Sequence, residues 1–220
     1  MFDEILKKAP TKKRVNAMQL TKANVYVADF ETTSLPNLNV DHYVRVWLWS
    51  LVEVETKVAY YGFDILSFLK KIDELDVRIC YFHNLKFDGS FLLDYFVRNN
   101  IEFDLTAPHG IWFSLEYRNC EFRDSLKKFK MTVKGMAKFL GMEAKKDVSD
   151  DTGKQPWDYY IPANYEANLK EIEYCVHDSR IVAYAIEKEW DAGRRRLTTS
   201  SEAYNNCKQK LKGFKTFFQS

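Results

Sequence analysis

One short run, residues 25–31, constrains the fold of this chain more than any other segment. Its β-branched and aromatic residues, Val-Tyr-Val-Ala followed by Phe30, favour a buried strand. Residues two apart in a strand point to the same face, so the carboxylates of Asp29 and Glu31 lie together. Burying two like charges is costly unless a cation neutralises them. Divalent cations neutralise such a pair, but Asp-x-Glu alone is a weak signal of a metal site.

The rest of the chain alternates between strand-like and helix-like patterns. Expected strands cover residues 44–53, 56–61 and 77–82, a hairpin covers 111–123, and helices cover 65–75, 87–99, 132–140 and 168–192. Asp64 is predicted to cap the first helix, while Gly141 and Gly193 are predicted to end the last two. This order predicts an α/β domain with a mixed central sheet and helices packed on it.

Charge divides the 220 residues into three parts. Residues 1–23 hold six Lys or Arg against two acids, and residues 194–220 hold seven against one, so the body at 24–193 is acidic. We expect a basic N-terminal extension, a folded domain at 24–193 and a basic C-terminal segment. Basic ends on an acidic body suit a protein that gathers divalent cations centrally and binds phosphate at its margins. The alternative is two solvated, partly mobile termini.

The cysteines and the hydropathy pattern exclude several classes of protein. The four cysteines are widely spaced, with no Cys-x-x-Cys pair, which argues against structural zinc. No signal peptide and no apolar span of about 20 residues is present. We therefore expect a reduced, cytoplasmic protein with no membrane partner.

Two later motifs supply further carboxylates. In Tyr81-Phe-His-Asn-Leu-Lys-Phe-Asp88, an expected strand runs into Asn84, which is predicted to cap the next helix, and Asp88 follows one helical turn later. In the last long helix, Tyr174 and Asp178 are four residues apart and share a face. Taken alone, each motif is equally compatible with an exposed charge on a helix.

Considered jointly, the motifs indicate a catalytic metal centre. Asp29, Glu31, Asp88 and Asp178 make four carboxylates, enough for two Mg²⁺ or Mn²⁺ ions. Such a pair of ions activates water and stabilises the leaving oxygen of a phosphodiester. Tyr174, beside Asp178, is placed to hydrogen-bond the attacking water or the scissile phosphate.

The order Asp-x-Glu, Asn-x-x-x-Asp, Tyr-x-x-x-Asp resembles the proofreading exonuclease domain of DNA polymerases, which has an RNase H-like (DnaQ-like) fold. The runs at 29–33 and 81–89 are most similar to the protein-primed family B polymerases of phages, as are 123–128 and 133–137. The likeness covers roughly residues 25–215. It implies a 3′→5′ exonuclease that releases nucleoside monophosphates from the 3′ end of single-stranded DNA.

The resemblance also implies roles at matching positions. The four carboxylates would be metal ligands, Tyr174 would assist the water, and Lys146, or Lys145 beside it, would be a catalytic lysine. The residues expected to hold the single strand are Thr32, Tyr81, His83, Asn84, Phe87, Ser125 and Leu126, with Tyr81 and His83 touching either the strand or a priming protein. Phe87 suits core packing equally well, and the pair at 125–126 suits a loop leading into a helix.

The relatives continue into polymerase regions, whereas this sequence stops at Ser220. We therefore expect a nuclease that proofreads only with a separate polymerase subunit. Two alternatives stand beside it. One is a catalytically idle module that binds a single strand or a priming protein; the other is a truncated piece of a full polymerase. The initial Met and the basic extension favour a true start.

Overall fold

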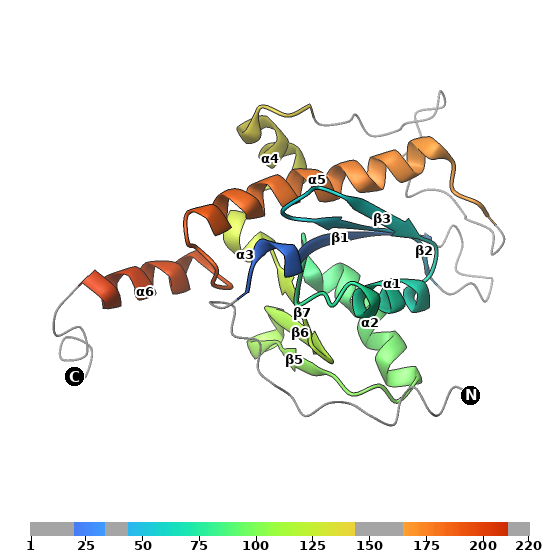
Figure 1. The fold of residues 1–220 in the computed structure, drawn as a ribbon. Helices are drawn as coiled ribbons and strands as arrows, with labels where there is room; N and C mark the ends of the chain where they lie inside the picture. The colour runs from blue at the N-terminus through green and yellow to red at the C-terminus, as the bar shows by residue number, and fades with distance from the viewer. Residues whose placement is uncertain (1–19, 34–43, 144–164, 211–220) are drawn as a thin grey trace.

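The computed structural model describes residues 20–33, 44–143 and 165–210 (Figure 1). Its strands are β1 (Val25–Thr32), β2 (Val46–Glu53), β3 (Ala59–Gly62), β4 (Ile79–Phe82), β5 (Asp104–Thr106), β6 (Ser114–Tyr117) and β7 (Cys120–Asp124). Its α-helices are α1 (Ile65–Glu74), α2 (Leu85–Arg98), α3 (Leu126–Phe129), α4 (Val133–Leu140), α5 (Leu169–Asp191) and α6 (Thr199–Lys210). Two short 3-10 helices are η1 (Lys22–Asn24) and η2 (Pro108–Gly110).

The seven strands form one mixed sheet in the order β3-β2-β1-β4-β7-β6-β5. β1 pairs antiparallel with β2 and parallel with β4, and β4 pairs parallel with β7. The pairing of β1 with β4 covers only Val25 to Val27, so β1 continues past β4 with β2 alone beside it. The acidic end of β1 therefore extends beyond the parallel centre of the sheet, where α2 begins.

The two faces of the sheet pack against different helices (Figure 1). Tyr26, Ala28 and Phe30 of β1 join the core that includes α1 and α2, while Val25 and Val27 join the core that includes α4 and α5. This alternation follows from the two-residue period of a strand. It places Asp29, the next residue on the Val25 and Val27 side, toward α5.

Several local expectations are confirmed. The Asp64 side chain caps α1 by accepting a hydrogen bond from the Ser67 N–H at 2.8 Å. Gly141 ends α4 at a φ of 69°, and Gly193 follows α5 at a φ of 74°. These positive φ angles favour glycine, which lacks the Cβ that would clash there. The hairpin of β6 and β7 turns at Arg118, as expected.

The segment after α5 is tied to the sheet by two buried cations, Arg123 of β7 and Lys128 of α3. Lys128 Nζ donates to the carbonyls of Arg194 at 3.2 Å and Arg196 at 2.7 Å, and Arg123 donates to the carbonyl of Arg195 at 3.1 Å. We call Arg123, Lys128 and the carbonyls they bind the cation anchor. The segment after α5 then leads into α6. The sequence predicted neither α6 nor the short elements β5 and α3.

Three acids lie against the cations of the cation anchor. Glu121 accepts a hydrogen bond from Arg123 at 2.6 Å, while Glu189 and Glu202 lie 3.9 Å and 3.8 Å from Lys128 Nζ. Glu202, in the first turn of α6, is itself buried.

Among the described residues, no helix combines the length and the apolar character needed to cross a membrane.

Candidate metal centre and strand-binding site

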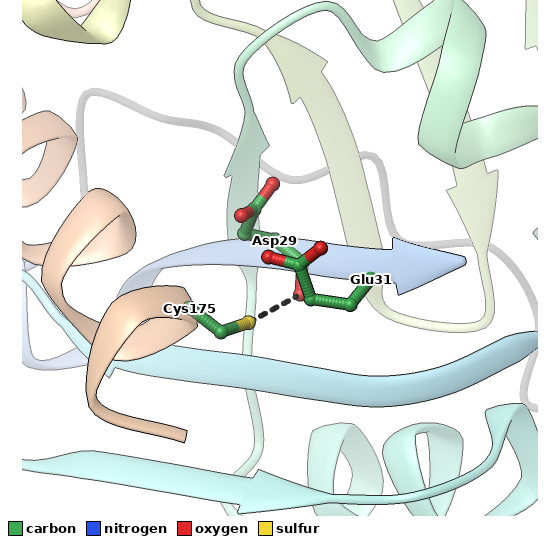
Figure 2. Close-up of side chains that lie close together, drawn as sticks. All are labelled: Asp29, Glu31 and Cys175. Atoms are coloured by element: carbon green, nitrogen blue, oxygen red, sulfur yellow. Dashed lines mark hydrogen bonds between the residues drawn. The ribbon is translucent and has the colours of Figure 1, made fainter. Parts of the chain in front are cut away.

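The two acids of β1 lie side by side and face α5 (Figure 2). The ligand atoms of Asp29, Glu31 and Cys175 all lie within 4.8 Å of one another. Both acids are only partly exposed. The strand geometry expected from their spacing therefore brings both carboxylates to one point against α5.

Asp88 and Asp178 bring two further carboxylates to the same place. Asp88 lies in the first turn of α2 and is 3% exposed. Asp178 is half-buried in the first half of α5. Both act on Asp29 strongly enough to shift its pKa. We call the carboxylates of Asp29, Glu31, Asp88 and Asp178 the acidic site.

Burial and mutual repulsion raise the pKa values in the acidic site. Burial is the largest cause of the raised pKa of Asp29, followed by the charges of Asp88, Glu31 and Asp178. The pKa of Glu31 rises to about 7, through burial and then the charges of Asp178 and Glu171. These carboxyls therefore ionise together only when something else supplies positive charge.

The pKa of Asp88 is also raised, although two hydrogen bonds partly offset the increase. Burial raises its pKa to about 8, while hydrogen bonds from its own backbone N–H and from that of Phe30 act in the opposite direction. The charges of Glu31 and Asp124 add to the increase. A buried carboxylate held by backbone N–H groups carries no compensating charge from them and remains open to a cation.

The donor set fits hard divalent cations. Mg²⁺ and Mn²⁺ prefer oxygen ligands, and carboxylates are their usual protein ligands. Burial and neighbouring carboxylates raise the pKa values of Asp29, Glu31 and Asp88, and bound cations would offset both effects. The acidic site therefore suits such ions on chemical grounds.

Cys175, which the sequence interpretation gave no role, lies beneath the two β1 acids. Its Sγ donates to the backbone carbonyl of Asp29 at 3.7 Å (Figure 2). Its own carbonyl accepts from Ser50 Oγ at 3.1 Å, and Ser50 Oγ is 2.7 Å from Ser179 Oγ. Burial raises the pKa of the Cys175 thiol well above its ordinary value, so the thiol keeps its proton. It fixes α5 to β1 as a donor.

Parallel pairing brings two of the expected strand-binding segments together. Phe82 at the end of β4 pairs with Asp124 at the end of β7, so the loops that follow leave the same edge of the sheet. Asn84 is exposed, and Leu126 is partly exposed. Phe87 is 50% exposed and meets Phe91 edge-on at 5.7 Å. The exposed ring of Phe87 favours the surface alternative over core packing.

Three expectations differ from the structure. Tyr81 is fully buried in the core beside α5, so its ring has no surface with which to touch a strand or a priming protein. Ser125 is also fully buried; its hydroxyl donates to the carbonyl of Phe82 at 3.1 Å, and its Oγ lies 2.9 Å from His83 Nδ1. Asn84 occupies the N-cap position of α2, but its side chain makes no capping hydrogen bond.

The remaining predicted residues are placed as follows. His83 is partly buried, and its Nε2 donates to the carbonyl of Met131 at 2.8 Å. Thr32, the last residue of β1, and Tyr174 on α5 are half-buried near the acidic site. Lys146 lies outside the described residues and stays a prediction.

The mixed sheet, with carboxylates from β1, α2 and α5 at one point, defines an α/β domain of the RNase H-like class, as predicted. The solved phi29 DNA polymerase with primer-template DNA and incoming nucleotides matches with a TM-score of 0.75 at 24% identity, over 87% of this chain and 35% of that one. The family B DNA polymerase of the archaeon Pyrobaculum calidifontis matches with a TM-score of 0.54 at 14% identity, over 76% of this chain and 24% of that one.

Comparison of the amino-acid sequence with those of known proteins identifies related phage DNA polymerases. The DNA polymerase of Bacillus phage Nf is 27% identical over 212 residues, covering 87% of this chain and 34% of that polymerase. The DNA polymerase of Streptococcus phage Cp-1 is 28% identical over 217 residues, covering 86% of this chain and 36% of that polymerase. No family model matches the sequence. The chain is thus a homologue of the phi29-like phage DNA polymerases and spans about a third of the length of those it matches.

Proposed function

We propose that this chain is a 3′→5′ exonuclease that hydrolyses single-stranded DNA to nucleoside monophosphates with two divalent cations. The observation that carries the proposal is the acidic site, in which burial and neighbouring carboxylates, Asp178 of α5 among them, raise the pKa values of acids from β1 and α2. Buried like charges destabilise a fold, so their presence at one point calls for a ligand. The homology to phage DNA polymerases makes DNA the expected substrate.

In this proposal Asp29, Glu31, Asp88 and Asp178 hold the two Mg²⁺ or Mn²⁺ ions. When bound, the ions activate the attacking water and stabilise the leaving oxygen. Tyr174 orients that water by hydrogen bonding from the neighbouring turn of α5. Lys146 stays a proposed catalytic lysine, with Lys145 as its alternative.

The proposed path of the strand follows the exposed residues at the edge of the sheet. The Phe87 ring stacks on a base, which suits any sequence because every base has an aromatic face. The Asn84 amide, Leu126 and Thr32 contact the terminal nucleotides. His83 and Ser125 act together through their hydrogen bond, since Ser125 itself is buried.

The test is a time course with a 5′-labelled single-stranded oligonucleotide in Mg²⁺ or Mn²⁺. A ladder that shortens from the 3′ end is expected, and chelation should stop it. The variant with Asp29→Ala and Glu31→Ala should lose hydrolysis yet keep its thermal unfolding transition. Asp94→Ala is the matched control, because Asp94 is an exposed carboxylate on α2 that pairs with Arg98 at 2.8 Å.

Other outcomes decide between the alternatives. Internal cuts would show an endonuclease, and degradation unaffected by EDTA or by the double variant would refute the metal mechanism. Strand binding without product after hours in Mn²⁺ would instead show a binding module. The intact set of four mutually repelling carboxylates argues against that alternative, because a module that only binds has no use for them.

A further inference from the structure

Asp124, the last residue of β7, joins two segments that are about 40 residues apart in the chain. It is 2% exposed. Its Oδ1 accepts hydrogen bonds from the backbone N–H of Asn84 at 3.2 Å and from that of Leu126 at 2.9 Å. Its Oδ2 lies 3.4 Å from Lys127 Nζ. One carboxylate thus ties together the loops that follow β4 and β7, and both loops carry residues proposed to touch DNA.

The bond to Asn84 replaces one that the start of α2 would otherwise supply itself. In a capping box, the third residue of a helix reaches back to the backbone N–H of the N-cap residue. In α2 that third position is Phe87, which has no acceptor. Because Asp124 accepts the Asn84 N–H from another strand, this position is free to carry an exposed aromatic ring.

The Asn84 side-chain amide does not cap the helix, because the N–H of Phe87 donates to the Asn84 backbone carbonyl at 2.9 Å. Asn84 has φ 82° and ψ 58°, a left-handed conformation that asparagine tolerates better than most residues. Its side chain is exposed and, within the described part of the chain, makes no capping hydrogen bond. Asp124 therefore holds the backbone of Asn84, and the side-chain amide of Asn84 makes no hydrogen bond that caps the helix.

We infer that Asp124 is a positioning residue for single-stranded DNA, which fixes the loops of Asn84 and Leu126 to each other so that both engage one strand. The inference rests on the proposed function, because the strand is that of the proposed nuclease. Asp124 itself touches no DNA, since it is buried. It acts through Asn84, so the two residues should behave as one unit.

The experiment measures the fluorescence anisotropy of an oligothymidylate that carries fluorescein at its 5′ end and has an unmodified 3′ end. EDTA is present to stop hydrolysis. Asp124→Ala should raise the Kd about tenfold, the size of one lost hydrogen bond in a binding site. Asn84→Ala should raise the Kd by a similar factor. The combined variant should bind no more weakly than the weaker single variant, because residues in one unit are not additive.

Conservative variants and a matched control separate positioning from folding. Asp124→Asn keeps an oxygen acceptor at the same place and should stay within about threefold of the wild type. Asp124→Glu keeps the charge but moves the acceptor, so it should bind more weakly than Asp124→Asn even if Asp124→Ala does not fold. Asp64→Ala removes the capping carboxylate of α1 and should lower the melting temperature without changing the Kd.

Two results would overturn the inference: single effects that multiply in the combined variant, or Asp124 variants that lower the melting temperature but leave the Kd unchanged. A wild-type chain that neither binds nor shortens the oligonucleotide would overturn the proposed function as well. If the wild type does both and the Asp124 variants bind normally, only the positioning role fails.

Discussion

The acidic site and the cation anchor are both clusters of buried charge against α5, but they are built in opposite ways. In the cation anchor, each cation has carbonyl and carboxylate partners, such as the 2.7 Å bond from Lys128 to the Arg196 carbonyl. In the acidic site the strongest neighbours of Asp29 and Glu31 are other carboxylates, which raise their pKa values. The cations of the first cluster find partners of opposite charge within the described chain, whereas the second cluster gathers carboxylates whose pKa values are raised.

This contrast separates a structural use of buried charge from a functional one. A paired buried charge is costly to break, because removing one partner leaves the other without compensation. An uncompensated group of like charges opposes folding, so removing one member should relieve the fold. Stability and activity should therefore respond in opposite directions in the acidic site, but only stability should respond in the cation anchor.

The largest expected effect is on hydrolysis by Asp88→Asn. The substitution keeps the shape of the side chain but removes a proposed metal ligand, so the rate should fall about a thousandfold, corresponding to several kcal/mol of transition-state stabilisation. Thermal unfolding in EDTA should occur at an equal or higher temperature, because one buried like charge is gone. Unchanged hydrolysis would remove Asp88 from the proposed centre.

The next effect is a pH dependence of the metal-free protein. The pKa values of Glu31 and Asp88 rise in the folded state to about 7 and about 8, from ordinary values of 4.5 and 3.8. The folded state then holds more protons than the unfolded state between these limits, so its stability falls as pH rises through the folded pKa values.

Melting temperatures in EDTA at about pH 5, 6, 7 and 8 test this linkage. The wild type should melt at progressively lower temperature, and Mg²⁺ should restore stability at the highest pH. The variant with Asp29→Asn and Glu31→Gln should show a shallower trend. A metal-free wild type that becomes more stable across this range would contradict the assignment of raised pKa values.

A smaller effect is expected in the cation anchor. Lys128→Met fills the same space but leaves two carbonyls without their donor and the buried Glu202 without its neighbouring cation. It should lower the free energy of unfolding by about 3 kcal/mol, as expected when one partner of a buried pair is removed. Hydrolysis per folded molecule should stay at the wild-type rate. A lost rate at full stability would connect the cation anchor with the acidic site.

The smallest effect is expected at an exposed pair. Lys71 and Glu74 on α1 are 2.7 Å apart, with Glu74 63% exposed. Lys71→Ala should change the free energy of unfolding by at most about 0.5 kcal/mol, because water screens such pairs. Chemical denaturation measures it, and a value close to that of Lys128→Met would mean that burial does not separate the two kinds of pair.

The features that could be predicted from the sequence are those determined by residues close together in the chain. The alternation of β1, the Asp64 cap and the glycine ends of α4 and α5 follow from local conformational preferences, and all are confirmed. The same locality brings Asp29 and Glu31 together, because a strand places residues two apart on one face. Parallel ends of β4 and β7 then set the place of the neighbouring loops.

What the sequence did not predict depends on contacts between distant segments. The burial of Tyr81 follows from which face of β4 lies under α5, and the bond from the Asn84 N–H to Asp124 follows from the pairing of β4 with β7. Helix α6 has a mostly polar sequence and is attached through the buried Lys128 and Glu202. No local pattern carries this information, because each contact exists only after the sheet has its final strand order.

The hydrogen bond from Cys175 to the Asp29 carbonyl has a consequence for how the protein folds. It joins residues about 146 positions apart, across most of the described chain. Contacts of such long range form late, because the chain must close a long loop before they return any free energy. The acids of β1 can gather early, but Asp178 reaches them only when α5 docks. During refolding, metal binding should therefore appear in the same slow step as burial of the Cys175 thiol, after the strands have paired.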